Sequence, residues 1–329
     1  MRNKIILFNA KPYDREFFES ANRSHGFEIQ YTESHLTLET AALARGFQVV
    51  CVFANDTLTA PLIEALYHNG TQLIALRCAG YNNVDLKAAK DKIAVVRVPF
   101  YSQTAVAEHA VALMLALNRK LHHAHMRVRE NNFSIVGLMG FDMRGKTAGV
   151  IGCGLIGKAT INILKGFGMR VLGYDIAPEE VKKAGVEFAD LPTLYRESDI
   201  ITLHCPLTAE NTHMIDRRAI AQMKDGVMII NTGRGALIHT ADLIAAVKSH
   251  KIGSAGLDVY EGETPYFYDD LSLSIMSDDA LARLETFPNV LITSHQAFFT
   301  KEALENIANT TLQNIADFEK GKPLINAVS

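Results

Sequence analysis

The chain has 329 residues, of which 48% are hydrophobic and 21% charged, with a formal net charge of −3. This length exceeds what one hydrophobic core usually organises, so two domains are expected. The small net charge gives no basis for binding nucleic acid or an anionic membrane. The first apolar run is too short for a signal peptide, and no run approaches the roughly 18 residues that span a bilayer. We therefore expect a cytoplasmic protein without a bound metal.

Short β-rich runs alternate with helical stretches along the first hundred residues. These runs are KIILF, FEIQY, VVCVFA, LIALRCAG and IAVVRVP. Such alternation predicts βαβ units and a parallel sheet. Pro99 then marks the end of the first series. The stretch that follows contains no proline or glycine and predicts one long helix from Thr104 to about Arg129.

A second series of the same kind follows this helix. Its runs are TAGVIG, RVLGYD, VEFA, IITLHCP, VMIINT, SAGLDV and NVLITSH. The chain closes with KEALENIANTTLQNIADFEKG, in which the apolar residues repeat at helical spacing. The pattern alone does not assign this last helix to either series. The sequence thus predicts an α/β fold with two doubly wound parallel sheets.

Three glycines, Gly152, Gly154 and Gly157, form a G-x-G-x-x-G motif directly after a predicted strand and at the start of a helix. The first permits a tight turn, the second lets a pyrophosphate approach the backbone, and the third allows close packing of helix on strand. Asp175 ends the next predicted strand. A carboxylate there accepts hydrogen bonds from a ribose 2′-hydroxyl and repels a 2′-phosphate. The motif predicts NAD rather than NADP, and a purely structural glycine turn is the alternative.

Polar residues end the later strands, at the sheet edge where α/β proteins bind ligands. Reduction of a 2-oxo acid needs a cation for the carboxylate, a hydride donor and an acid for the ketone oxygen. Arg234, between two glycines in NTGRG, suits the carboxylate because a guanidinium binds it through two parallel hydrogen bonds. His295 suits the acid, because histidine titrates near neutral pH. Glu263 in DVYEGE is the candidate partner for its other ring nitrogen, and Glu261 is a weaker one.

Several of these residues also have a plainer interpretation. His295 could be a hydrogen-bonded core histidine, and His109 is interpreted as a packing or interface residue. His122 and His125 have the spacing of a metal-binding pair, but no cysteine or carboxylate cluster accompanies them, so a solvated helix face is preferred. Arg77 lies in an otherwise apolar strand and is assigned to a buried ion pair.

The order of motifs along the chain resembles that of the D-isomer-specific 2-hydroxyacid dehydrogenases. These motifs are the glycine motif with its distal aspartate, HCP, NTGRG, DVYEGE and HQAFFT. Within that family the resemblance is closest to the fermentative NAD-dependent D-lactate dehydrogenases. RCAGYNNVD, VAEHA and TLQN extend it over nearly the whole chain. The resemblance implies that Arg234 binds substrate, that His295 is the acid and base, and that Glu263 is its partner.

The resemblance also implies further site residues. Substrate contacts are expected from the backbone around Ala79 and Gly80 and from the side chains of Tyr101 and Phe299. Cofactor contacts are expected from the glycine motif and from Leu155, Ile156, Asp175, His204, Cys205, Pro206, Asn211, Thr232, Gly233, Arg234, Asp258 and His295.

The family architecture implies that the last helix packs on the first domain. Residues 1–100 with 299–329 would then form a substrate and catalytic domain, residues 101–298 a Rossmann-like NAD-binding domain, and a cleft would lie between them. The expected reaction is the reversible NADH-dependent reduction of pyruvate to D-lactate. The alternatives are a dehydrogenase for bulkier 2-oxo acids and an NADH-sensing regulator without turnover.

The expected partners are a small 2-oxo or 2-hydroxy acid and further copies of the chain, as a dimer or a dimer of dimers. The apolar stretch AVALMLAL in the long helix is a candidate for an isologous patch.

Overall fold

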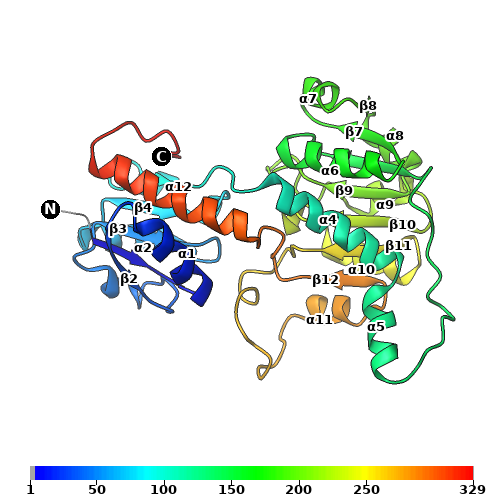
Figure 1. The fold of residues 1–329 in the computed structure, drawn as a ribbon, viewed down its shortest axis with the longest axis horizontal. Helices are drawn as coiled ribbons and strands as arrows, with labels where there is room; N and C mark the ends of the chain where they lie inside the picture. The colour runs from blue at the N-terminus through cyan, green and yellow to red at the C-terminus, as the bar shows by residue number, and fades with distance from the viewer. Residues whose placement is uncertain (1–3, 329) are drawn as a thin grey trace. The chain divides into compact units, whose positions relative to one another are not determined.

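The computed structural model describes residues 4–328, which divide into two compact units (Figure 1). The first unit runs to Ser102 and resumes at Phe299, and the second comprises residues 103–298. Each unit is built on a parallel β-sheet of its own. Within the described residues the twelve predicted strands are all present. The predicted class, α/β with two parallel sheets, is confirmed.

The first unit contains a five-stranded sheet in the order β2-β1-β3-β4-β5. Its strands are β1 (Lys4–Leu7), β2 (Glu28–Tyr31), β3 (Val49–Val52), β4 (Leu73–Leu76) and β5 (Ala94–Val96). Every pair is parallel. The strand order reverses direction between β1 and β3, so helices cover both faces of the sheet. The three middle strands are buried nearly throughout, which explains their continuous apolar sequences.

Both ends of the chain contribute helices to the first unit. These helices are α1 (Pro12–Asn22), α2 (Ala60–His68), α3 (Leu86–Ala89), α12 (Lys301–Glu319) and the short 3₁₀ turn η1 (Ala41–Ala44). Figure 1 shows α12 beside α1, although nearly the whole chain separates them in sequence. The Thr300 side chain caps α12 by accepting a hydrogen bond from the Ala303 N–H. The apolar face of α12, including Leu312 and Ile315, is buried in one core with Ile5 and Leu7 of β1.

The second unit contains a seven-stranded parallel sheet in the order β12-β11-β10-β9-β6-β7-β8. Its strands are β6 (Thr147–Ile151), β7 (Arg170–Tyr174), β8 (Glu187–Phe188), β9 (Ile200–Leu203), β10 (Val227–Asn231), β11 (Ile252–Leu257) and β12 (Val290–Ile292). Numbered from β6, the strands run 3-2-1-4-5-6-7, which is the dinucleotide-binding order with one added strand. The order reverses between β6 and β9, and ligands bind at the carboxyl ends of strands on either side of such a point.

Helices cover the second sheet on both faces. The helices of this unit are α4 (Gln103–Asn118), α5 (Leu121–Arg129), α6 (Leu155–Gly166), α7 (Pro178–Lys183), α8 (Leu191–Glu197), α9 (Arg217–Gln222), α10 (Thr240–Lys248), α11 (Asp279–Glu285) and the 3₁₀ turn η2 (Gly235–Leu237). Two separate apolar cores, one on each side of the sheet, hold these helices in place, except α5, which has no buried residue and contributes to neither core.

The prediction of one long helix from Thr104 to Arg129 was wrong. The helix ends at Asn118, and α5 starts after Lys120, whose φ of +50° is left-handed. The buried side chain of Asn118 accepts a hydrogen bond from the Phe141 N–H and donates one to the Phe141 carbonyl. This pairing holds the end of α4 against a segment 23 residues further along the chain, and the chain changes direction there.

The apolar stretch AVALMLAL is also not the surface patch that we expected. Five of its side chains, Ala110, Val111, Leu113, Met114 and Leu117, lie in the core that α4 shares with α6 and the sheet. Several exposed apolar side chains lie in the next segment instead, among them Leu121, Phe133 and Ile135.

Candidate active site

The glycine motif forms the turn from β6 to α6. Gly152 has a φ of +92°, and a Cβ there would lie 2.5 Å from the Cys205 nitrogen and 2.6 Å from the His204 carbonyl carbon. A Cβ on Gly157 would lie 1.9 Å from the Gly152 oxygen. Both positions therefore exclude any larger residue. A Cβ on Gly154, by contrast, would have no described atom within 4 Å.

Gly154 is the N-cap of α6 and supplies no side-chain oxygen to the first N–H groups of the helix. Leu155, in the first turn, is 58% exposed. A helix N-terminus with unpaired N–H groups and open space in front of it fits the pyrophosphate of a dinucleotide. The geometry of this turn is therefore compatible with the predicted dinucleotide cofactor.

Asp175 follows β7 and lies against the same turn. Its carboxylate accepts hydrogen bonds from the Cys153 N–H at 2.8 Å and from the Ala177 N–H at 2.9 Å. These two bonds use different oxygens, so each oxygen retains an acceptor position for a ribose hydroxyl. The carboxylate is thus fixed in place and still able to bind a sugar.

Two buried polar atoms, one beyond β9 and one beyond β10, have unsatisfied hydrogen-bonding capacity. The Thr232 hydroxyl and the Nδ1 atom of His204 are buried and form no hydrogen bond within residues 4–328. Burial lowers the pKa of His204 to about 4, and its Nε2 atom lies 2.9 Å from the Thr202 hydroxyl. Unpaired buried polar atoms are rare in proteins, so they favour a ligand or ordered water at this position.

Asn211 stabilises the loop after His204 through hydrogen bonds. The Asn211 amide donates to the Pro206 carbonyl at 2.7 Å and accepts from the Thr208 N–H at 2.7 Å. The Cys205 sulfur lies 4.0 Å from the sulfur of Met214. In the structure these residues shape the loop, and their contact with the cofactor stays a prediction.

Arg234 lies in a tight turn after β10. The fully buried Asn231 closes this turn, because its side chain donates to the Arg234 carbonyl at 2.9 Å and accepts from the Gly233 N–H at 3.0 Å. The guanidinium of Arg234 donates to the Gly233 carbonyl at 2.7 Å. A Cβ on Gly235 would lie 2.1 Å from the Tyr260 carbonyl carbon. The absence of a side chain there brings the Arg234 turn against the loop that follows β11.

Glu263, in that loop, is paired with His295. Its Oε1 atom lies 2.7 Å from Nδ1 of His295, and its Oε2 atom accepts from the Tyr260 N–H at 2.8 Å. The two side chains are 18% and 22% exposed. Within the described residues the ring of His295 makes this one hydrogen bond, through Nδ1.

The weaker candidate, Glu261, has different partners. Its carboxylate contacts Nε2 of His213 at 2.5 Å and accepts from the Thr240 hydroxyl at 2.8 Å. Glu261 therefore connects the loop after β11 to the start of α10. It precedes Glu263 by two residues and takes no part in the Glu263–His295 pair. Sequence spacing alone could not separate the two glutamates.

The remaining predicted residues lie in the first unit, at the carboxyl ends of β4 and β5 and before α12. Arg97 donates to the Ala79 carbonyl at 2.8 Å, and the Cys78 thiol donates to the Gly80 carbonyl at 3.2 Å. The Tyr101 carbonyl accepts from the Asn306 side chain at 2.8 Å.

The ring of Phe299 makes an edge contact with Tyr13, at 4.7 Å between centroids, and its side chain is 47% exposed. Sequence reasoning missed Tyr13. The prediction that Arg77 forms a buried ion pair is confirmed, since its Nε atom lies 3.2 Å from the Asp14 carboxylate.

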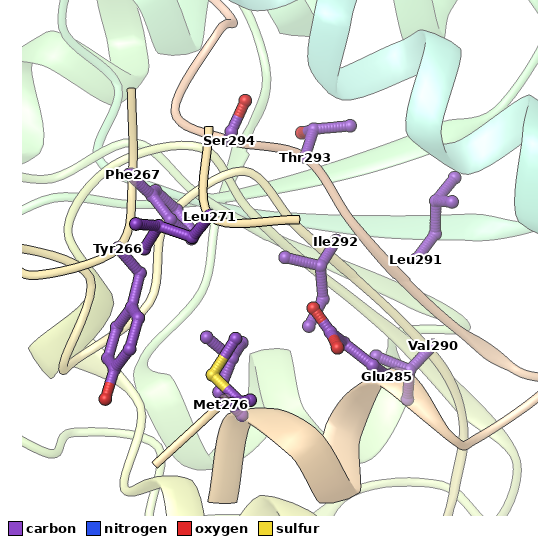
Figure 2. A pocket seen from close by; sticks show the side chains of 11 residues that line it. Tyr266, Phe267, Leu271, Met276, Glu285, Val290, Leu291, Ile292, Thr293 and Ser294 are labelled. Carbon is purple, nitrogen blue, oxygen red and sulfur yellow. The ribbon is translucent and has the colours of Figure 1, made fainter. Parts of the chain in front are cut away.

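The second unit also contains a cavity of about 400 Å³, which neither Glu263 nor His295 lines. Figure 2 shows it between the loop after Glu263, helix α11 and strand β12. Its lining includes Tyr266, Phe267, Thr293 and Ser294, which are close in sequence to Glu263 or His295. The lining includes no Arg, Lys or His, so this cavity lacks a cation for a carboxylate.

Among residues 4–328 no group of three or more His, Cys, Asp or Glu side chains could hold a metal ion. No helix in the same range is long and apolar enough to cross a membrane.

Known proteins resemble this chain over nearly its whole length. Residues 111–297 match the family described as "D-isomer specific 2-hydroxyacid dehydrogenase, NAD binding domain". Over 321 residues the chain is 52% identical to the D-lactate dehydrogenase of Escherichia coli (strain K12), which covers 97% of this chain and 98% of that protein.

Two solved structures are similar in fold. The pyruvate reductase of Chlamydomonas reinhardtii gives a TM-score of 0.93 at 44% identity, over 99% of this chain and 98% of that one. The NAD complex of the D-isomer specific 2-hydroxyacid dehydrogenase from Lactobacillus delbrueckii ssp. bulgaricus gives a TM-score of 0.83 at 30% identity, over 99% and 100%.

Proposed function

Because this chain belongs to the D-isomer-specific 2-hydroxyacid dehydrogenase family and is an NAD-dependent oxidoreductase, we propose that it reduces pyruvate to D-lactate in a reversible reaction. The names of two similar proteins, a D-lactate dehydrogenase and a pyruvate reductase, support this choice of substrate. The observation that carries the proposal is the His295–Glu263 pair, with the Arg234 turn packed against the same loop.

Arg234 is proposed to bind the carboxylate of the substrate. A planar guanidinium binds a carboxylate through two parallel hydrogen bonds and keeps its charge at any physiological pH. One of its N–H groups is already bonded to the Gly233 carbonyl, which limits the motion of the side chain. The remaining donors are available to the substrate.

His295 is proposed to move the proton. Protonated His295 donates from Nε2 to the ketone oxygen as that oxygen gains negative charge, and Nδ1 stays hydrogen-bonded to Glu263. The Glu263 carboxylate stabilises the imidazolium and fixes the orientation of the ring. NADH, when bound, supplies the hydride that reduces the ketone carbon. One proton and one hydride convert the ketone into an alcohol, and solvent returns a proton to His295.

The cofactor would be held by the residues beyond β6, β7, β9 and β10. The N-terminus of α6 and the glycine turn would bind the pyrophosphate, and Asp175 would bind the ribose. His204 and Thr232 would meet the cofactor with their unpaired atoms.

The first unit is proposed to supply the rest of the substrate site. The N–H groups around Ala79 and Gly80 would bind the carboxylate, and Tyr101 and Phe299 would contact the substituent on the carbonyl carbon. The contact of Phe299 with Tyr13 supports its ring. The space left by these aromatic rings would decide between pyruvate and bulkier 2-oxo acids.

The test is NADH oxidation with pyruvate, 2-oxobutyrate, phenylpyruvate and 4-methyl-2-oxopentanoate, followed by chiral analysis of the product. We expect the highest kcat/KM with pyruvate and a product of D configuration. Preference for a larger acid would assign the chain to a different substrate. Tight NADH binding without oxidation by any acid would favour the regulatory alternative.

A His295→Gln variant tests the proton donor. We expect its turnover to fall by about a hundredfold or more, since general acid catalysis contributes about 10²–10⁴-fold. NADH affinity, measured by fluorescence titration, should remain close to that of the wild type. Turnover like that of the wild type would remove His295 from the mechanism.

We also propose that the chain forms homo-oligomers through its arm, defined here as residues 119–141. In Figure 1 the arm loops away from the rest of the second unit. Its apolar side chains are largely exposed: Leu121, Met126, Val128, Phe133, Ile135, Val136, Met139 and Phe141. Exposed apolar surface of this extent marks an interaction site, and a second copy is the expected partner.

Light scattering tests this assembly. An Ile135→Asp, Val136→Asp double variant should lower the molar mass in solution. An unchanged mass would exclude the arm as the interface.

A further inference from the structure

His295 has an unusual backbone conformation. Its φ of +53° lies in the left-handed region, which residues other than glycine adopt uncommonly. The His295 N–H donates to the carbonyls of Asp258, at 2.7 Å, and Thr293, at 3.0 Å. The Tyr268 hydroxyl donates to the His295 carbonyl at 3.1 Å. The direction of the imidazole thus depends on the turn from Thr293 to Ala297.

The carboxylate of Asp258 organises this turn. Its Oδ1 atom accepts hydrogen bonds from the Thr293 hydroxyl at 2.6 Å and the Gln296 N–H at 2.9 Å, and its Oδ2 atom accepts from the Ala297 N–H at 2.9 Å. The side chain is completely buried. Two consecutive backbone N–H groups directly after His295 are therefore anchored to one carboxylate.

His109, on helix α4, also lies against this carboxylate. Its Nε2 atom lies 3.1 Å from the Thr293 hydroxyl and 3.3 Å from Oδ1 of Asp258. The Thr293 hydroxyl donates its hydrogen bond to Asp258. Its oxygen can therefore accept a hydrogen bond from the Nε2–H group of His109. The neutral Nε2–H tautomer and the imidazolium both supply that proton.

The charge of Asp258 also depends on these contacts. Burial acts to raise the pKa of Asp258, but hydrogen bonds from His109, Thr293 and the Ala297 N–H outweigh it and hold this pKa below its usual value. A buried carboxylate that loses such a donor either takes up a proton or rearranges. In both cases the turn after His295 loses an anchor.

We propose that His109 is a positioning residue, which acts through Asp258 and Thr293 to hold His295 in the conformation that pairs it with Glu263. The proposal rests on the proposed role of His295 as proton donor. In this scheme His109, the histidine of VAEHA, lies on helix α4 and affects the proposed active site through its contacts with Thr293 and Asp258. His109 itself touches neither substrate nor the reacting atoms in this scheme.

Two substitutions separate this role from simple packing. His109→Leu fills similar space without a donor, and His109→Gln retains an N–H donor near the position of Nε2. We expect His109→Leu to lower kcat by about 10- to 100-fold, because small misplacements of a catalytic group have effects of this size. The KM for pyruvate should change by less than about threefold, since the Arg234 turn is untouched. His109→Gln should recover most of the lost kcat.

A second readout does not depend on turnover. The Nδ1–H proton of His295, hydrogen-bonded to Glu263, should give a downfield proton NMR signal in the protein without cofactor, and a His295→Gln sample assigns it. His109→Leu should shift or broaden that signal, and His109→Gln should restore it. The control is His68→Leu, which removes an exposed histidine on α2 and should leave the signal and kcat unchanged.

These readouts can fail separately from the proposed reaction. If the wild type reduces no 2-oxo acid, the proposed function fails, and the NMR signal still decides the role of His109. If His109→Leu leaves both the signal and kcat as in the wild type, the positioning role is excluded. Equal loss of kcat in the Leu and Gln variants, with an unshifted His295 signal, would indicate packing alone.

Discussion

Replacement of Glu263 by glutamine is the most informative single change to the proposed site. The two carboxylate oxygens serve two different donors, because Oε1 faces Nδ1 of His295 at 2.7 Å and Oε2 faces the Tyr260 N–H at 2.8 Å. Glutamine has the same shape but only one acceptor oxygen. Whichever way its amide turns, one of the two donors then faces an NH₂ group or loses its bond.

The expected cost follows from this geometry. A hydrogen bond to a charged group contributes about 1.5–3 kcal/mol, and both partners here are mostly shielded from solvent. If the amide oxygen stays with Tyr260, the imidazolium form of His295 loses that stabilisation. At about 1.4 kcal/mol per factor of ten, kcat for pyruvate reduction should fall about 10- to 100-fold.

The assay is steady-state NADH oxidation with pyruvate over a range of pH. The loss in Glu263→Gln should appear in kcat, because the imidazole that donates the proton loses its hydrogen bond to the Glu263 carboxylate. Glu263→Asp is the matched control, since it keeps the charge and shortens the reach. If Glu263→Gln turned over as fast as the wild type across the pH range, the pairing seen here would have no part in catalysis.

Three further outcomes are expected. Arg234→Lys should raise the KM for pyruvate about 10-fold or more, because one charged hydrogen bond contributes about 1.5–3 kcal/mol, and an unchanged KM would discredit the carboxylate clamp. Gly235→Ala should lower the free energy of unfolding in urea by about 1–3 kcal/mol and reduce kcat, since the added Cβ meets the Tyr260 backbone; the control Gly166→Ala, in open space, should do neither. Burial lowers the pKa of His204 from 6.5 to about 4, so below pH 6.5 the unfolded chain binds its proton more readily, and stability is lost as the pH falls towards 4. His204→Gln should therefore remove about 2 kcal/mol of the stability difference between pH 7 and pH 5 in urea titrations, and equal acid sensitivity in both proteins would argue against this.

Local sequence patterns were sufficient to predict the strands and the glycine turn. Strands such as VMIIN and VVCV are buried on both faces, so their sequences are continuously apolar and easily recognised. The Gly152 turn was equally predictable, because neighbouring backbone leaves no space for a Cβ at its first and third glycines. In both cases the requirement acts on the residues of one short segment.

The end of α4 could not be predicted in the same way. Nothing between Thr104 and Arg129 breaks a helix locally, and the break depends on hydrogen bonds between Asn118 and Phe141. The identity of the histidine's partner was open for a related reason. Glu261 and Glu263 differ by two positions in one loop, and only the fold places His213 beside one and His295 beside the other.

The organising role of Asp258 was also missed. Its position at a strand end suggested a cofactor contact, whereas its carboxylate accepts hydrogen bonds from Thr293 and two backbone N–H groups. Such a role depends on residues more than thirty positions away, and on His109 in another helix. The direct contact of Asp258 with the cofactor, like the substrate contacts of the first unit, stays a prediction.

The location of α12 has a consequence for biosynthesis. The second unit is one continuous stretch, so it can fold on the ribosome as soon as its last strand emerges. The first unit begins earlier but lacks part of its core until α12 has been translated, since Leu312 and Ile315 pack against Ile5 and Leu7. Nascent chains would therefore lack the α12 side of this core until the end of their synthesis.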